Sequence, residues 1–202
     1  MASKARRERE AVWLRQEIMA AARELFASEG FENVSMRKIA VRIEYSPTTI
    51  YLYYKDKAEL LHEICETAFA QLSADILESW MASEKPIERL RLGMLAYINF
   101  GLNNPYQYEI VFISPKSKHL DAADYSFDTS AGKTSFELLI ASVKDCMEGG
   151  AVRQADLMVT AQTLWAGIHG VTSLLITHPG FPFKDRQTLP ASVVDTLIAG
   201  IK

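Results

Sequence analysis

Residues 35–61 read SMRKIAVRIEYSPTTIYLYYKDKAELL and decide the fold of the first part of the chain. Ser35 is a typical helix N-cap residue, and apolar residues follow it at helical spacing. Ser46 and Pro47 combine another N-cap residue with the residue best suited to the first position of a helix. A second helix over residues 47–54 would therefore follow the first after only a short turn. This pattern predicts a helix-turn-helix unit, whose second helix enters a DNA major groove.

The side chains of the second predicted helix favour contact with DNA. Hydroxyl groups lie at its N-terminal end, where helix-turn-helix proteins reach base edges, and phenol groups suit phosphate oxygens. Ile50 and Tyr54, four residues apart, would face the core. With two basic residues of the first helix, the candidate DNA contacts are Arg37, Lys38, Ser46, Pro47, Thr48, Thr49, Tyr51 and Tyr53. The alternative is a solvated polar helix in an unrelated helical domain.

Lys57 lies at the predicted start of a third helix, where Asp56 and Glu59 form a capping pair. A cation at this position faces the positive end of the helix dipole, which is unfavourable. A nearby anion would offset that cost, because helix N-termini bind phosphate through free backbone N–H groups. We therefore expect Lys57 to hold a DNA phosphate. A lysine that is merely tolerated on the surface is the alternative.

Residues 18–64 are similar to the DNA-binding domain of TetR-type transcriptional repressors. The resemblance rests on an apolar first helix, on Gly30-Phe31, on Ile39-Ala40, and on the aromatic pair Tyr53-Tyr54. It implies a three-helix head that binds operator DNA. The family positions that touch DNA, mostly at phosphates, match Ser35, Tyr45, Ser46, Thr48, Tyr51, Tyr53 and Lys57.

The turn between the two short helices departs from the family pattern. The family usually has glycine where this chain has Glu44, preceded by alanine where it has Ile43. That glycine serves a left-handed backbone conformation, which costs other residues about 1–2 kcal/mol. Either Glu44 is strained or the turn takes another path, and its carboxylate would lie close to the DNA.

Charge is distributed unevenly along the chain, whose net charge is −3. Residues 1–60 hold 11 basic and 9 acidic side chains, whereas residues 61–202 hold 11 basic and 16 acidic ones. The basic side chains of the first part concentrate in residues 4–15 and 37–57. This asymmetry fits a basic edge that faces DNA on an otherwise acidic protein.

Other features of the chain suggest its organisation and its compartment. Two cysteines, Cys65 and Cys146, are too few for a disulfide framework, and neither a secretory signal nor a run of 18 apolar residues is seen. We therefore expect a cytoplasmic protein without a membrane span. The charged residues 1–10 predict a flexible arm, within a DNA-binding domain of residues 1–56. Residues 57–202 would form a ligand-binding and dimerisation domain.

The second domain shows helical periodicity throughout and no strand alternation, so the fold class is all-α, with a helix-turn-helix head on a helical bundle. Proline, glycine and the apolar pattern place helices at residues 59–80, 86–101, 105–112, 134–147, 156–178 and from 190 onward. Residues 114–130 are expected to be a loop.

Two helices of this domain are expected to form a homodimer interface. Trp165, His169 and Gly170 resemble the Trp-His-Gly signature of one class of TetR-type C-terminal domain. Gly167 and Gly170 make one side of this helix thin enough for another helix to approach. The resemblance implies a pair of dimerising helices, from Asp156 to His178 and from Pro190 to Lys202. Ordinary packing within one chain is the alternative.

Aromatic residues of the second domain could line an apolar pocket for a small-molecule effector. The candidates are Tyr97, Phe100, Tyr108, Phe112, Phe136, Trp165 and His169. They are equally what a helical core needs. No nucleophile–base set, no metal site and no cofactor motif is recognised, so we expect no enzyme. The leading function is a homodimeric repressor released from operator DNA by a small apolar or amphipathic ligand. The alternatives are a DNA-binding dimer without a switch, and a helical enzyme or small-molecule carrier.

Overall fold

A computed structural model describes residues 2–113 and 130–202. Two compact units make up the chain. Of the described residues, 2–65 and 109–113 belong to the N-terminal unit, and 66–108 and 130–202 belong to the C-terminal unit. The described residues form helices and turns without a strand, which confirms the all-α prediction.

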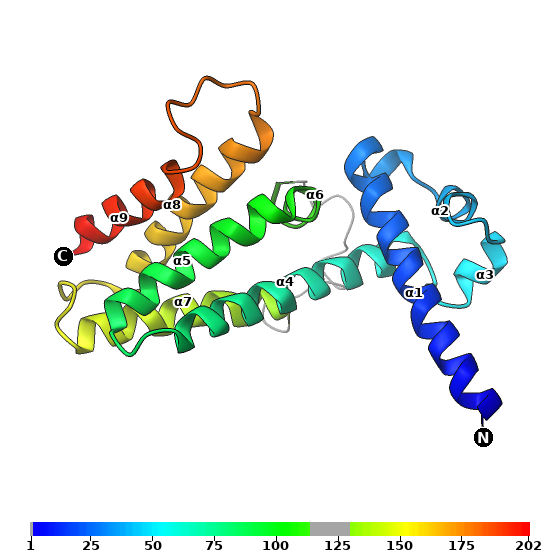
Figure 1. Cartoon of the computed structure of the whole chain (residues 1–202), viewed down its shortest axis with the longest axis horizontal. Helices are drawn as coiled ribbons and strands as arrows, with labels where there is room; N and C mark the ends of the chain where they lie inside the picture. Colours follow the sequence, from blue (N-terminus) through cyan, green and yellow to red (C-terminus); the bar gives the residue numbers. More distant parts are fainter. Residues whose placement is uncertain (1, 114–129) are drawn as a thin grey trace. The chain divides into compact units, whose positions relative to one another are not determined.

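The N-terminal unit is a small helical domain (Figure 1). Its elements are α1 (Ala2–Glu29), η1 (Phe31–Asn33), α2 (Met36–Arg42), α3 (Pro47–Tyr51), the first turns of α4 (Lys57–Met81), and η2 (Glu109–Ile113). The core of this unit takes side chains from α1 to α4, and its deeply buried members include Ile18, Ala22, Ile39, Ile50, Tyr54 and Leu60. The helix-turn-helix of α2 and α3 is therefore anchored by buried side chains, and α2 packs against α1.

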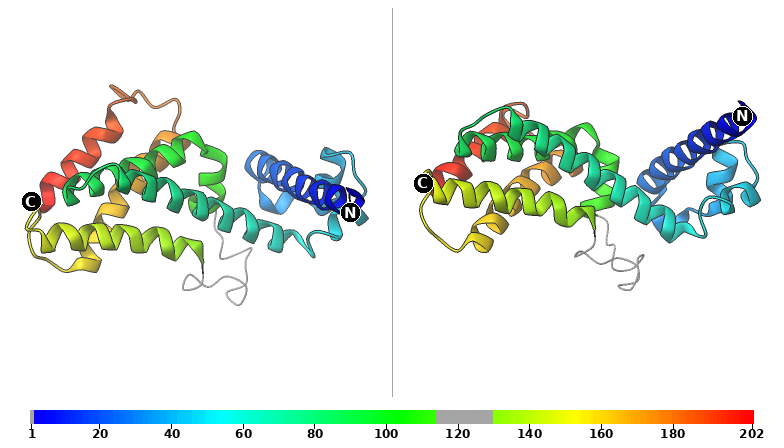
Figure 2. Two further views of the ribbon diagram at one scale, coloured as in Figure 1. Left: turned by 60° about the horizontal axis from the view of Figure 1, so that its bottom comes forward. Right: turned by 90° about the horizontal axis from the view of Figure 1, so that it is seen from below.

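The C-terminal unit is a bundle of longer helices (Figures 1 and 2). It contains the remainder of α4, then α5 (Pro86–Asn103), α6 (Pro105–Tyr108), α7 (Ala131–Glu148), α8 (Leu157–Thr177) and α9 (Leu189–Ile201). Helix α5 lies centrally and packs against α7, α8 and α9, and α8 also packs along α9. Buried residues at these contacts include Leu90, Met94, Ile98, Leu164 and Val194.

Three expectations about element bounds need correction. Residues 2–10 continue α1 as helix, so the predicted flexible arm is wrong for them. The residues of this segment lack proline and glycine and include several good helix formers, which explains the extension. Helix α3 ends at Tyr51 instead of residue 54, and α5 continues past Gly101 to Asn103. The predicted loop lies almost wholly in residues 114–129, outside the described residues.

Within the part of the chain that the structure describes, no helix is both long and apolar enough to cross a membrane.

Candidate DNA interface and effector site

Both predicted N-caps of the helix-turn-helix are confirmed. The Ser35 hydroxyl accepts a hydrogen bond from the backbone N–H of Lys38 at 3.2 Å. The Ser46 hydroxyl accepts one from the backbone N–H of Thr49 at 3.1 Å, and Pro47 occupies the first turn of α3. The hydroxyl groups of Ser46 and Thr49 also bond each other at 2.8 Å. Because caps satisfy backbone donors that a helix cannot, these bonds set where α2 and α3 begin.

Glu44 lies in the turn between α2 and α3 with a φ of 62°, in the left-handed region. The turn is closed by a hydrogen bond from Tyr45 N–H to Ala40 O at 2.9 Å. Of the two possibilities that the sequence left open, strain at Glu44 is therefore the correct one. The turn keeps the left-handed geometry that glycine usually serves, although a side chain is present.

Most of the predicted DNA contacts are exposed on α2, on α3 and in the turn between them. The exposed ones are Ser35, Arg37, Lys38, Tyr45, Ser46, Thr48 and Tyr51, and the partly exposed ones are Pro47, Thr49 and Tyr53. Tyr51 is 54% exposed, whereas Ile50 and Tyr54 are buried, as predicted for the core-facing pair. Phenol and hydroxyl groups are thus available at the surface for phosphate oxygens or base edges.

Two of the basic side chains of α2 are engaged with α1. Lys38 pairs with Glu29, and an Arg42 guanidinium nitrogen lies 2.8 Å from a Glu24 carboxylate oxygen. Both pairs are exposed to solvent, and exposed ion pairs contribute only about 0–1 kcal/mol to the stability of a folded protein. DNA phosphates can therefore replace the carboxylates at little cost. For Arg37, the described residues provide no ion pair within 4.0 Å.

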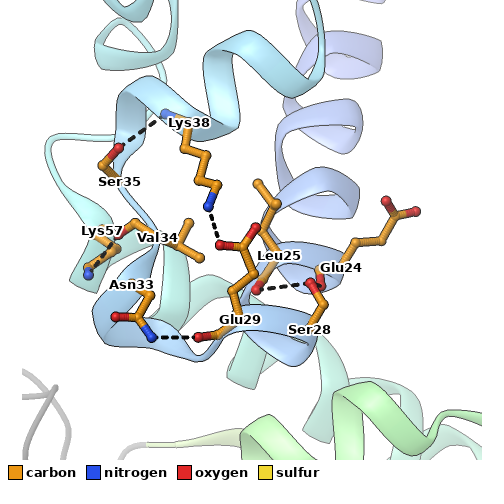
Figure 3. Close-up of polar contacts among 9 residues, drawn as sticks. All are labelled: Glu24, Leu25, Ser28, Glu29, Asn33, Val34, Ser35, Lys38 and Lys57. Atoms are coloured by element: carbon orange, nitrogen blue, oxygen red, sulfur yellow. Dashed lines mark hydrogen bonds and ion pairs between the residues drawn. The ribbon is translucent and has the colours of Figure 1, made fainter.

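Lys57 is engaged within the N-terminal unit (Figure 3). Its ammonium donates hydrogen bonds to the backbone carbonyls of Phe31, at 2.6 Å, and Val34, at 2.9 Å. The same nitrogen lies 4.2 Å from the centroid of the Phe31 ring. The predicted capping pair is present, since Asp56 accepts from Glu59 N–H at 2.9 Å. The sequence predicted a phosphate for this cation, and the structure shows partners from the protein itself.

An ion pair between Arg15 of α1 and Glu63 of α4 was not predicted from the sequence. The Arg15 guanidinium donates two hydrogen bonds to the Glu63 carboxylate, one of them at 2.8 Å, and lies 4.9 Å from the centroid of the Tyr54 ring. The bonds with Arg15 hold the pKa of Glu63 below its usual value. The two residues are far apart in the sequence, and no local pattern joins them.

Four of the predicted effector residues meet in the C-terminal unit. The hydroxyl groups of Tyr97 and Tyr108 lie 3.0 Å apart. They lie 3.2 Å and 2.7 Å, respectively, from Nδ1 of His169. The indole N–H of Trp165 donates to the Tyr97 hydroxyl at 3.3 Å. This effector cluster of Tyr97, Tyr108, Trp165 and His169 joins α5, α6 and α8.

The effector cluster is uncharged at neutral pH. Burial lowers the pKa of His169 and raises the pKa of Tyr97 to about 12. Burial also raises the pKa of Tyr108. A neutral imidazole accepts at one nitrogen, and the shortest bond to Nδ1 is that of Tyr108. In the tautomer with its proton on Nε2, donation can run from Trp165 through Tyr97 and Tyr108 to Nδ1.

The remaining predicted effector residues differ in their placement. The Phe136 ring of α7 lies 5.9 Å from the Trp165 ring, between centroids, which brings it beside the effector cluster. Phe100 is buried in α5. Phe112 lies in η2 and belongs to the N-terminal unit, so its predicted part in the same pocket stays a prediction.

Gly101 is a neighbour of the effector cluster that sequence reasoning missed. A Cβ atom at this position would lie 2.4 Å from Thr172 Cγ2 and 2.8 Å from the Tyr108 ring. Only glycine lets α5 approach α8 and the Tyr108 ring so closely. Gly101 follows Tyr97 by four residues, so both lie on one side of α5. This spacing is the sequence signal that could have identified Gly101 as a neighbour of the site.

The two predicted dimerisation helices, α8 and α9, lie side by side in one chain (Figures 1 and 2). At Gly167 the close approach is made by Leu197 of the same chain, since a Cβ there would lie 2.6 Å from Leu197 Cδ1. The packing alternative is therefore correct at Gly167. Among the described residues, and apart from the local backbone of α8, nothing lies within 4 Å of a Cβ built at Gly170. Val159 and Leu174 of α8 are exposed by 59% and 50%.

The described residues hold no group of three or more His, Cys, Asp or Glu side chains that could bind a metal ion.

Comparison with protein families gives two matches. Residues 18–64 match the model for "Bacterial regulatory proteins, tetR family", and residues 90–198 match that for "Tetracyclin repressor-like, C-terminal domain". An uncharacterized HTH-type transcriptional regulator of Haemophilus influenzae is 32% identical over 78 residues, which are 39% of this chain and 42% of that protein. The chain thus spans less than half the length of the curated relatives it matches.

Solved structures show the same fold over nearly the whole chain. A tetR-family regulatory protein from Rhodococcus RHA1 has a TM-score of 0.80 at 19% identity, covering 93% of this chain and 96% of that one. FadR from Bacillus subtilis, solved with stearoyl-CoA, has a TM-score of 0.79 at 20% identity, covering 93% and 99%. Because the two family models together span most of the chain, the protein belongs to the tetR family of bacterial regulatory proteins.

Proposed function

We propose that the protein is a homodimeric transcriptional repressor that a small apolar or amphipathic molecule releases from operator DNA. The observation that carries the proposal is the capped helix-turn-helix of α2 and α3, which presents exposed polar side chains on a packed core. We assign the protein no catalytic activity and place it in the cytoplasm, where bacterial operators lie.

Helix α3 supplies the proposed base and phosphate contacts. Thr48 and Tyr51 are exposed. Small hydroxyl groups at the N-terminal end of a recognition helix reach base edges, and phenol groups reach phosphates. Arg37 and Lys38 of α2 would neutralise phosphates beside the groove. The remaining proposed contacts are Ser35, Tyr45, Ser46, Pro47, Thr49 and Tyr53.

The effector cluster suggests the chemistry of the ligand. Its polar groups are two phenols, an indole N–H and a neutral imidazole, none of which carries a charge. The Phe136 ring lies beside them. Such a site suits a largely apolar molecule with an uncharged hydrogen-bonding group. The fold is compatible with an amphipathic ligand, since FadR, of the same fold, was solved with stearoyl-CoA.

The chain itself connects the effector cluster to the N-terminal unit. Tyr108 ends α6, and the next residues form η2, which packs against α1 within the N-terminal unit. A ligand that displaces the Tyr108 ring would therefore act on the segment that contacts α1. Such a ligand releases DNA only if it binds the DNA-free conformation more tightly, because equal affinity for both states shifts nothing.

A homodimer is part of the proposal because one recognition helix reads too few bases for useful specificity. Among the described residues nothing fills the space beside Gly170, and Val159 and Leu174 of the same helix are exposed. We propose that α8 and α9 of two copies pack together through this side.

A mobility-shift assay with the region upstream of the gene tests the DNA-binding part of the proposal. The full chain should shift this DNA at salt concentrations where an unrelated duplex is not shifted. Thr48→Ala and Tyr51→Ala should each weaken the shift, whereas Val41→Ala, on an exposed side chain of α2 outside the proposed contacts, should not. Equal binding to both duplexes would exclude a sequence-specific regulator.

A further inference from the structure

The turn between α2 and α3 carries a negative charge next to the proposed DNA contacts. We propose that the Glu44 carboxylate repels DNA phosphates and thereby weakens the sequence-independent attraction between the N-terminal unit and DNA. Stable binding then depends on the base contacts of α3. This inference rests on the proposed DNA-binding function, and it concerns a residue that is not among the proposed contacts.

The position of Glu44 in the chain brings its charge close to the segment that would hold phosphates. Glu44 is exposed, and so are Tyr45 and Ser46, the two proposed contacts that follow it. Consecutive Cα atoms are about 3.8 Å apart, so the Cα atom of Glu44 lies within about 8 Å of both of theirs. The Debye length is about 10 Å at 0.1 M salt, so charges at such separations are not fully screened. Phosphates held by this segment are therefore repelled by the Glu44 carboxylate.

The charge of Glu44 is not compensated within the N-terminal unit. Glu24 and Glu29 of α1 each pair with a basic side chain of α2. Arg42, two positions before Glu44, is one of these basic residues, and its guanidinium lies 2.8 Å from the Glu24 carboxylate. Among the described residues, no cation lies within 4.0 Å of the Glu44 carboxylate. The turn therefore presents a full negative charge where DNA phosphates would approach.

A side chain at this position is unfavourable for the fold. Glu44 has a φ of 62°, in the left-handed region, where glycine would be unstrained. Its backbone N–H donates to Val41 O at 3.2 Å, a bond that glycine would make equally well. Strained residues concentrate at functional sites, where other interactions hold them in place. An effect on DNA is the function that the charge and the position of Glu44 allow.

The repulsion acts on all DNA sequences alike, because every duplex has the same phosphate backbone. Base contacts from the N-terminal end of α3 add affinity only at matching sequences. The carboxylate therefore lowers the affinity for operator and unrelated DNA by the same factor. Unrelated DNA, which lacks the base contacts, is then the first to fall below the affinity needed for stable binding.

A salt titration of DNA binding by the full chain, followed by fluorescence anisotropy, tests the proposal. The two duplexes are the region upstream of the gene and an unrelated sequence. Glu44→Gln removes the charge but keeps the side-chain shape and the backbone strain. We expect this variant to bind both duplexes several-fold more tightly at low salt, with a gain that shrinks as salt screens the charge. The slope of log affinity against log salt should become steeper by up to about one.

Three further variants separate the charge at this position from other effects. Glu44→Asp keeps the charge and should bind like the wild type. Glu44→Gly removes both the charge and the strain, and it should bind like Glu44→Gln. Glu78→Gln, at an exposed residue of α4 within the C-terminal unit, makes the same change in net charge and should bind like the wild type.

Unchanged affinity of Glu44→Gln, or an equal gain in Glu78→Gln, would overturn the inference. A gain in Glu44→Gly alone would also overturn it, because the strained backbone would then be the cause. Weaker binding of Glu44→Gln to the upstream region would do the same, since the carboxylate would then accept a hydrogen bond from a base edge. Failure of the proposed function appears differently, as a wild type that binds both duplexes equally while Glu44→Gln still binds both more tightly.

Discussion

At Glu44 the backbone carries φ 62° in the turn between α2 and α3, where glycine would be unstrained. The resemblance to the family pattern singled out this position but left open whether Glu44 is strained or the turn takes another path, and the positive φ decides for strain. At Lys57 the sequence could not predict the partners. They are carbonyls more than twenty positions earlier, and only the folded chain brings them to the ammonium.

Replacing Glu44 by glycine should stabilise the protein. The left-handed conformation costs a side chain about 1–2 kcal/mol, and glycine removes that cost. We expect Glu44→Gly to raise the free energy of unfolding by about this amount, measured by urea denaturation. Glu44→Gln removes the charge but keeps the strain, so it should not be stabilising. Equal stability of wild type and Glu44→Gly would show that the turn is not strained.

His169 should make stability depend on pH. Burial lowers its folded-state pKa from the ordinary value of 6.5, so the unfolded chain binds a proton first as pH falls. The contribution of neutral His169 to the free energy of unfolding is fully present above pH 6.5. It is lost as pH falls from that value toward the lowered pKa of the folded state. The unfolding free energy of the wild type should therefore decline in this window more steeply than that of His169→Asn. Parallel pH profiles of the two proteins would contradict a buried neutral imidazole.

At the scale of elements, local sequence signals predicted helix starts correctly where an N-cap residue defines them, but the end predicted at Gly101 was wrong because α5 continues to Asn103. Ser35 and Ser46 cap the helices they were predicted to cap, because capping depends only on residues within one turn. Residues 2–10 were mispredicted because charge was taken as a sign of an arm, although several of these residues are good helix formers. The close approach at Gly101 depends on three helices meeting, which no local pattern specifies.

Two glycines of α5 should respond in opposite directions to alanine. At Gly101 the new methyl group would overlap Thr172 and the Tyr108 ring, so Gly101→Ala should cost about 1–3 kcal/mol of stability. At Gly93 the nearest atom, Ile76 Cγ2, would lie at 3.6 Å, an ordinary contact. Gly93→Ala should therefore stabilise α5 by about 0.5–1 kcal/mol. Thermal denaturation of both variants checks this, and equal melting temperatures would contradict the packing described at Gly101.

At the scale of the whole molecule, the sequence predicted the fold class and the family correctly, because both follow from helical periodicity and from motifs that span many residues. It also named seven side chains of the second domain as candidates for one pocket, and four of them, Tyr97, Tyr108, Trp165 and His169, lie together. It could not say which aromatic side chains meet, since that depends on how α5, α6 and α8 pack.

The proposed packing of α8 against a second copy of the chain can be tested at Gly170. If the Gly170 side of α8 packs against a second copy, Gly170→Glu should place a charge in that interface and yield monomers. Within one chain the position has room, so the variant should remain helical by circular dichroism. Sedimentation velocity measures the mass. Folded dimers of unaltered mass would exclude this side of α8 as the interface.

Selection of bound sequences from a pool of random duplex DNA tests the central claim most directly, since it requires neither the effector nor a known operator. A homodimer with one α3 helix per copy should enrich a two-fold repeat. Its half-site centres should lie about one DNA turn apart, roughly 34–36 Å, or at a multiple of that distance. Thr48→Ala should change the enriched bases while leaving the half-site spacing unchanged. A pool that shows no enriched sequence with the wild type, although the protein is folded, would contradict the account.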